Sequence, residues 1–446
     1  MTEARRPAVR RAAVRRAAAD LQVWAYPLIL AQRLRFNFTQ PADPLAPRPP
    51  VSAGAALGRF GHARRLADPA LRVGVAPNVD TLYSVAWLDV RRGPHRVVLP
   101  TATDRYLSLQ VGKADTTSPV VISRRSHPEG FPELVVERGA PGVVADPREV
   151  RVTTRDRWLM LVGRTGVEPE DPADLAAAHA VQDALSLRGP HHETTAVDGE
   201  ADEVDVALAA VERDHEILDP GAFARALRRV LATGGESVAW ERRDALLEAV
   251  RLDELARDHG DEELRSAVAD GLRDGYDAVR AHVRALGGAV AGWALNEKVA
   301  SFGEDHLSRA AVAHSQIYVN PPEEASYPVC EVDAEGRALD GRDADYRIAF
   351  APGTPPVRGF WSLTMYRGVG NLVANELGRY AIGDRTRGLE RSADGSLEID
   401  ISARRPDRGA ANWLPAPRGP FRLMLRLYWP CDPSWQPPPV IRRMTR

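Results

Sequence analysis

The stretch YLSLQV at residues 106–111 carries the clearest strand signal in the chain. Leucine or valine at positions 107, 109 and 111 alternates with tyrosine, serine and glutamine, which is typical of a half-buried β-strand. Similar short apolar runs, separated by proline, glycine or charged turns, lie at residues 97–99, 120–122, 134–136 and 158–162. This spacing predicts an antiparallel sandwich or barrel over residues 53–170.

The same alternation returns towards the C-terminus. Aliphatic or aromatic residues occupy every second position in YRIAF (346–350), LEIDI (397–401) and LMLRL (423–427). These strands predict a second β domain over residues 317–446, about the size of one sandwich.

Between the two β regions the apolar period changes from two to three or four residues. The clearest stripe consists of Leu264, Val268, Leu272, Tyr276, Val279, Val283 and Leu286. It predicts a helical segment over residues 171–316, whose helices we expect to pack mostly among themselves. Residues 1–52 are predicted to form an N-terminal helix and a proline-rich loop. The expected fold class is α+β: two antiparallel β-sandwich or jelly-roll-like domains with a helical segment between them.

Composition excludes several classes of protein. The 446 residues carry a net charge of −2, which offers no basic field for nucleic acid. Two cysteines, Cys330 and Cys431, cannot make a disulfide framework. No run approaches the roughly 20 apolar residues that a membrane span requires. Arginine pairs at residues 5–16 precede an apolar run at 23–30 that Pro27 interrupts, so we expect a retained helix and a cytoplasmic protein.

The sequence lacks the sharp catalytic motifs. It contains no G-x-S-x-G elbow, phosphate-binding loop, H-E-x-x-H helix or G-x-G-x-x-G fingerprint. His306 and His314 share a helix face, but two histidines without a clear third ligand are weak evidence for metal. We therefore expect neither a metal nor an organic cofactor.

The densest group of candidate site residues lies in PNVDTLYSVAWLD at residues 77–89. Asn78 and Asp80 stand where the chain enters a strand, so they either form a structural turn or converge with Tyr83 on a ligand pocket. Trp87, further along this strand, is a candidate wall of that pocket. His62, just upstream, is a candidate general base with Asp80 and Tyr83 as catalytic partners, although a lone histidine is more often structural.

Arginines supply a candidate anion clamp. Arg379 and Arg385 flank Tyr380 and Asp384, and could hold a carboxylate or phosphate bidentately, or form a network with Asp384 alone. Arg105 follows Asp104 and is either a further ligand contact or half of a surface ion pair.

Two aromatic residues of the second β region complete the candidate site. Tyr366 and Trp413 could line a pocket where the two β domains meet, and an exposed Trp413 could stack on a sugar or an aromatic ring. The alternative for Trp413 is a place in the core. Lys113, after the strand at 106–111, is either a local specialisation or an exposed strand end.

Five phrases are distinctive as a set: PNVDTLYSVAWLDV (77–90), FWSLTMY (360–366), and the segments 375–386, 394–399 and 412–423. Together they resemble the family that pairs domain of unknown function 1254 (N-terminal) with domain of unknown function 1214 (C-terminal). The resemblance covers about residues 20–165 and 320–442. It implies two β-rich domains joined by a helical segment, and it implies no established reaction or catalytic residues.

Two classes of function fit these observations. The first is a cofactor-independent enzyme, a hydrolase, lyase or isomerase, that acts on a small organic substrate in a pocket between the two β domains. The alternative is a glycan or small-ligand binding protein without catalysis. A titratable group desolvated beside another charge would favour the enzyme. In either case we expect a small-molecule ligand and no nucleic acid or membrane partner, with a homo-oligomer as an open alternative.

Overall fold

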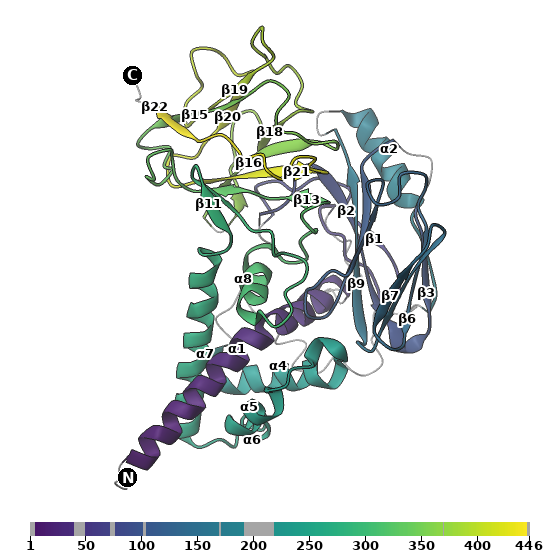
Figure 1. The fold of residues 1–446 in the computed structure, drawn as a ribbon, viewed down its shortest axis with the longest axis vertical. Helices are drawn as coiled ribbons and strands as arrows, with labels where there is room; N and C mark the ends of the chain where they lie inside the picture. The colour runs from purple at the N-terminus through teal and green to yellow at the C-terminus, as the bar shows by residue number, and fades with distance from the viewer. Residues whose placement is uncertain are drawn as a thin grey trace.

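The computed structural model describes residues 5–39, 50–71, 76–100, 104–168, 171–190, 218–368 and 370–443. In the view of Figure 1 the C-terminal β domain lies at the top and the first β domain at the right, and a group of helices packs below the former and beside the latter. The mixed α+β class expected from the sequence is confirmed. Of the predicted proline-rich loop, residues 40–49 lie outside the described residues.

The first β domain is a sandwich of two five-stranded sheets. One sheet has the order β1 (Gly61–His62), β2 (Thr81–Asp89), β9 (Trp158–Gly166), β4 (Leu107–Gly112) and β5 (Val120–Ser123). The other has the order β10 (Ser186–Arg188), β3 (His95–Val98), β6 (Glu133–Arg138), β8 (Glu149–Thr154) and β7 (Gly142–Ala145). Leu107, Leu109 and Val111 of the stretch at 106–111 point into the core between the sheets, as the alternation predicts.

Every residue of β9 is buried, although its sheet has only one face towards the sandwich core. The opposite face of this sheet is covered by α1 and by the C-terminal domain, so its polar side chains are also removed from water. Because the C-terminal domain covers this outer face, polar side chains of the sheet become buried between the two β domains, where the candidate site lies.

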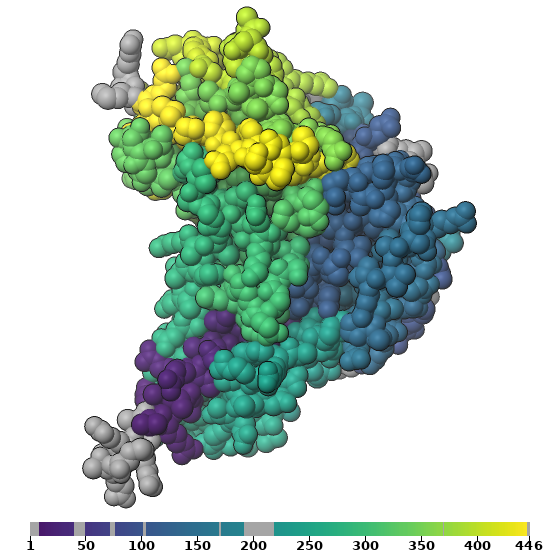
Figure 2. Space-filling model, viewed as in Figure 1, coloured from purple at the N-terminus to yellow at the C-terminus, as the bar shows by residue number. Residues whose placement is uncertain are grey.

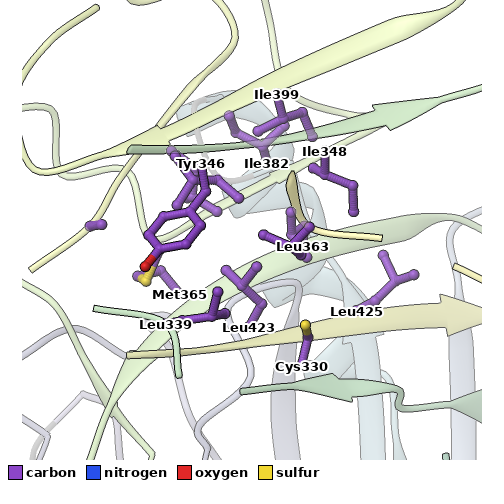
Figure 3. Packing of buried hydrophobic residues seen from close by; sticks show 14 of the residues in the cluster. Cys330, Leu339, Tyr346, Ile348, Leu363, Met365, Ile382, Ile399, Leu423 and Leu425 are labelled. Carbon is purple, nitrogen blue, oxygen red and sulfur yellow. The ribbon is translucent and has the colours of Figure 1, made fainter. Parts of the chain in front are cut away.

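The second β domain contains a larger and a smaller sheet. The larger sheet has the path β11 (Gly288–Val290), β12 (Trp293–Leu295), β14 (Val329–Cys330), β21 (Arg422–Tyr428), β16 (Trp361–Arg367) and β17 (Asn371–Leu372), with β13 (Ala325–Ser326) and β18 (Ala381–Gly383) at its side. The smaller sheet has the order β20 (Trp413–Pro415), β19 (Leu397–Ser402), β15 (Asp345–Phe350) and β22 (Ile441–Arg443). Figure 3 shows Ile348 and Ile399 of one sheet packing towards Leu363 and Leu425 of the other.

Neither sandwich is purely antiparallel. The pairs β6–β8 and β19–β20 run parallel, while the other named strand pairs are antiparallel. A parallel pair needs a crossover connection rather than a hairpin, so neither sandwich is a simple meander.

The helical region contains α2 (Pro172–Asp183), α4 (Pro220–Thr233), α5 (Arg243–Ala249), α6 (Leu252–Ala256), α7 (Glu262–Val283), α8 (His306–Gln316) and the short 3₁₀ turn η3 (Glu236–Val238). A second short 3₁₀ turn, η1 (Val90–Arg92), lies in the first β domain between β2 and β3. The long N-terminal helix α1 (Arg5–Thr39) lies across α7 and reaches the first β domain (Figure 1). Gly271 and Gly275 of α7 allow this close approach, because a Cβ at either position would clash with a backbone carbonyl oxygen of α1, that of Arg15 or that of Ala19.

The helical segment between the two β domains is confirmed, but the expectation that residues 172–314 pack mostly among themselves is wrong. The segment contributes β10 to the first sandwich, where Leu187 is in register with Val97, and β11 and β12 to the second. Its longest helix packs against α1. These three strands have only three residues each, too few to produce a period-two signal.

The apolar run at residues 23–30 belongs to the core of the helical region. Trp24, Leu28 and Ile29 are fully or almost fully buried, and pack with residues of α4 and α7. Within the part of the chain that the structure describes, no helix is both long enough and apolar enough to cross a membrane.

Candidate functional site

The candidate site is a cavity of about 100 Å³ where the two β domains meet. In Figure 2 the C-terminal domain, green to yellow, lies directly against the blue first β domain. The cavity is lined by residues 315–319, which form the end of α8 and the segment just after it. Side chains from both domains complete the lining: Asn78, Tyr83 and Arg164 from the first, and Tyr327, Met424 and Arg426 from the second. None of the described residues that line it is acidic.

Arg164 brings a buried positive charge to the cavity from β9. Its side chain donates to Asn320 Oδ1 and to the carbonyl oxygen of Tyr318, both at 3.1 Å. Its guanidinium lies 5.6 Å from the ring centroid of Tyr83. The residue is only 5% exposed, and among the described residues no carboxylate lies within ion-pair distance of it.

Arg426 brings a second buried charge from β21. It donates to Thr364 Oγ1 at 2.8 Å, to the carbonyl oxygen of Ala76 at 2.9 Å and to Tyr366 Oη at 2.7 Å. Its exposed fraction is 3%, and over the described ranges it also has no carboxylate at ion-pair distance. Arginine stays protonated in proteins, so both charges remain in this low-dielectric interior.

Two phenols lie beside these cations. Tyr327 Oη accepts a hydrogen bond from Asn320 Nδ2 at 3.0 Å, which leaves its own proton available to the cavity that it lines. Burial raises the pKa of Tyr327 to about 12, so this phenol is a neutral donor near pH 7. Tyr83 also lines the cavity. Asn320 therefore orients one cation and one phenol at once.

Asp80 lies behind the cavity wall and joins the two domains. Its Oδ2 accepts a hydrogen bond from Ser362 of β16 at 2.7 Å, and its Oδ1 lies 3.6 Å from Arg385 Nη2. The guanidinium of Arg385 covers the ring of Phe360 at 3.7 Å. Asn78 Oδ1 accepts from the Asp80 backbone amide and its Nδ2 donates to Tyr428 Oη, so both expected residues help to dock the domains.

Glu324 forms the reciprocal connection from the second domain. This fully buried carboxylate accepts hydrogen bonds from Tyr106, Ser123 and Arg125 of the first domain at 2.9, 2.7 and 3.0 Å. Trp429 Nε1 donates to it at 3.0 Å. Burial, reinforced by the Glu324 charge, raises the pKa of Tyr106 well above its usual value, so Tyr106 remains a donor. We call the Asp80 and Glu324 contacts the two carboxylate latches.

His62 and Asp80 are not brought together, and neither lines the cavity. His62 lies in β1, with its Nδ1 at 2.8 Å from Ser84 Oγ and its ring stacked on Phe60. It pairs in register with Ser84, four positions from Asp80, which corresponds to about 13 Å along an extended strand. Burial, with a smaller contribution from Arg64, lowers the pKa of His62 to about 4. The proposed acid–base pair is therefore wrong.

The four aromatic residues expected to line the pocket divide into two groups. Tyr83 lines the cavity, and fully buried Tyr366 lies behind it, donating to the carbonyl oxygen of Pro77 at 2.7 Å. Trp87 and Trp413 are core residues: Trp87 packs edge-on against Tyr318, and Trp413 Nε1 donates to the carbonyl oxygen of Ser402. With an exposed fraction of 3%, Trp413 cannot present a stacking platform.

The expected arginine clamp is a set of structural contacts. Arg379 donates to the carbonyl oxygens of Ala410, Ala411 and Trp413 and so holds a loop. Tyr380 packs beside Tyr366, Leu372 and Met424. Asp384 accepts from the Trp361 amide, and burial raises its pKa. These residues do not form the cavity wall.

Two further polar residues also have structural roles. Arg105 makes a bidentate ion pair with Asp174 of α2, both distances being 2.7 Å. Lys113 lies 3.1 Å from Glu236, which connects the first β domain to the helical region. Lys113 is therefore neither a cavity residue nor a fully exposed strand end.

Sequence reasoning missed Arg164, Asn320, Tyr327 and Arg426. Arg426 alternates with leucines and so has the pattern of a solvent-facing residue of a half-buried strand. The available signal was the position of Arg164, two residues after the continuous apolar run 158–162, because such runs indicate a strand covered on both faces. Over the described part of the chain, no group of three or more His, Cys, Asp or Glu residues could hold a metal ion.

The chain matches two family models. Residues 57–189 match the family described as protein of unknown function (DUF1254), and residues 324–432 match the family described as protein of unknown function (DUF1214). None of the curated proteins compared with the chain matches it.

Two crystal structures are similar to the whole chain. The VPA0106 protein from Vibrio parahaemolyticus is 20% identical, with a TM-score of 0.59, and the alignment covers 96% of this chain and 100% of that one. An uncharacterised protein from Burkholderia cenocepacia is 15% identical with a TM-score of 0.46, over 96% of this chain and 88% of that one. The first likeness shows a shared fold.

Proposed function

The chain belongs to the family that pairs these two domains of unknown function, and we propose that its interdomain cavity binds a small organic anion. The observation that carries this proposal is the pair of buried arginines, Arg164 and Arg426, that face a common cavity without a carboxylate partner among the described residues. A buried charge that is not paired is costly, so a ligand that neutralises it gains affinity.

The nature of the lining supports a carboxylate. Guanidinium groups match carboxylate oxygens in geometry as well as in charge, and neutral phenols such as Tyr327 add donors. The cavity of about 100 Å³ suits a molecule of only a few carbon atoms. A glycan is less well supported, because the two tryptophans that could have stacked on a sugar, Trp87 and Trp413, are buried.

Catalysis on the bound anion is a second candidate function. It is favoured by Tyr327, whose phenol carries a proton over the cavity and is held in place by Asn320. A fixed neutral phenol beside two cations can protonate or polarise a substrate oxygen, as a lyase or isomerase step requires. The absence of a cofactor from this reaction stays a prediction from the sequence.

Calorimetric titration of the full chain with acetate, propionate and malonate tests the proposal. Arg164→Gln and Arg426→Gln should each weaken anion binding about 10–100-fold, because a hydrogen bond to a charged group contributes about 1.5–3 kcal/mol. The exposed arginines Arg155 and Arg418 provide matched controls, and Arg155→Gln and Arg418→Gln should leave affinity unchanged. Equal effects of the cavity and control variants would refute the proposal, as would a wild-type protein that binds no anion.

We also propose that the protein is cytoplasmic and keeps its N-terminal helix. The support is that Trp24, Leu28 and Ile29 of α1 are core residues, so removal of this helix would uncover apolar surface. Mass spectrometry of the protein from its native host would test this, since a mature start after residue 30 contradicts it. A homo-oligomer stays a prediction that analytical ultracentrifugation would decide.

A further inference from the structure

We propose that the anion carries two negative charges and is a short dicarboxylate that bridges the two β domains. This inference rests on the proposed function and makes its ligand more specific. Three observations support it. The two arginines come from different β domains, each is held only by neutral groups, and the nearby carboxylates are already paired with other arginines.

The two cations belong to two separate half-sites. Arg164 extends from β9 of the first β domain and Arg426 from β21 of the second. Each guanidinium is fixed by neutral acceptors only: Asn320 and a carbonyl for Arg164, and Thr364, Tyr366 and a carbonyl for Arg426. Such acceptors orient a guanidinium without neutralising it, so each half-site retains its charge.

The carboxylates of the interface are already engaged. Glu324 is held by Arg125 and three neutral donors, and Asp80 by Arg385 and Ser362. Asp80 attracts Arg426 electrostatically, but it lies closer to Arg385, with which it shares its charge. The cavity lining therefore holds two positive charges and, among the described residues, no negative one. One carboxylate can neutralise only one of them, whereas a dicarboxylate places one group on each half-site.

The size of the cavity limits the length of this ligand. About 100 Å³ accommodates a chain of roughly two to four carbon atoms rather than a long acyl chain. Because one end would bind each β domain, the ligand would also tie the domains together, in addition to the two carboxylate latches.

Asn320 makes a selective test possible. Asn320→Asp is nearly isosteric, and it would place a carboxylate about 3 Å from Arg164, in the position where Asn320 Oδ1 now accepts. This built-in charge would neutralise the first half-site and leave Arg426 untouched. Arg164→Gln removes the same charge by a different route, so the two variants check each other if one of them folds poorly.

The experiment compares malonate and succinate with propionate and butyrate, by calorimetric titration of the full chain. We expect the wild type to bind the better dicarboxylate at least about tenfold more tightly than the monocarboxylate of the same length. Asn320→Asp and Arg164→Gln should weaken dicarboxylate binding more than monocarboxylate binding, because a monocarboxylate can still bind at Arg426 alone, and so should remove this difference. Monocarboxylates that bind as tightly as dicarboxylates would overturn the inference and leave the proposed function standing. Binding of neither class would overturn both.

Discussion

His62 lies within the first β domain, between the ring of Phe60 and the hydroxyl of Ser84. Ser84 is fully buried and accepts a hydrogen bond from Gln182 Nε2, so its own proton is directed to His62 Nδ1. This arrangement keeps the imidazole neutral. His62 therefore has a structural role, and not the role of general base that its residue type suggested.

His62 should make the protein acid-sensitive. Its pKa is lowered to about 4 in the folded state from the ordinary 6.5, so the unfolded chain takes up this proton first as the pH falls. Stability should fall between about pH 6.5 and pH 4, by about 1–2 kcal/mol because the imidazole keeps some hydration. Urea unfolding of the wild type and His62→Gln from pH 7.5 to 4 checks this. The variant should lose less stability than the wild type across that range, and parallel pH profiles would contradict the assignment.

At the scale of elements, the alternation of apolar and polar residues predicted those strands that have one apolar and one polar face. The segments 106–111, 346–350 and 397–401 all form strands where their pattern places them. The pattern does not say what covers the second face of a sheet. Arg164 and Arg426 are buried because segments far apart in sequence cover that face, so their role depends on tertiary contacts. The sequence identified Asn78 and Tyr83 at the cavity and predicted its place between the domains, but not the cations that define it.

The packing of α1 on α7 depends on glycine. A Cβ at Gly271 would lie so close to the Arg15 carbonyl oxygen that the two helices must move apart. We expect Gly271→Ala to destabilise the protein by about 1–3 kcal/mol, the usual cost of overpacking, despite the better helix propensity of alanine. The measurement is thermal unfolding of Gly271→Ala, with Gly419→Ala as the control. At Gly419 no atom lies within 4 Å of the added Cβ. Equal melting temperatures for the two variants would show that α1 does not pack this closely.

At the scale of the whole molecule, the two carboxylate latches dock one β domain onto the other. Each latch joins a buried acid of one domain to a serine and an arginine of the other: Ser362 and Arg385 for Asp80, and Ser123 and Arg125 for Glu324. This reciprocal arrangement fixes the domains and thereby the spacing of the two arginine half-sites. It also explains why Asp80, despite its promising position in the sequence, serves docking rather than proton transfer.

Loss of the Glu324 latch should destabilise the domain interface. Glu324→Gln keeps the shape but weakens the bonds to Arg125 and Ser123, and we expect a cost of about 2–3 kcal/mol. The exposed neighbour Glu323 is a matched control, so Glu323→Gln should unfold like the wild type. The measurement is urea unfolding followed by tryptophan fluorescence and, for domain docking, limited proteolysis. Identical midpoints for the two variants would contradict the role of Glu324.

The most direct test of the anion site is a crystal structure of the full chain with malonate. The arrangement of Arg164 and Arg426 predicts density for malonate in the interdomain cavity, with a carboxylate oxygen within hydrogen-bond distance of each guanidinium. A cavity that holds only water, in crystals where malonate is bound elsewhere on the protein, would contradict the account.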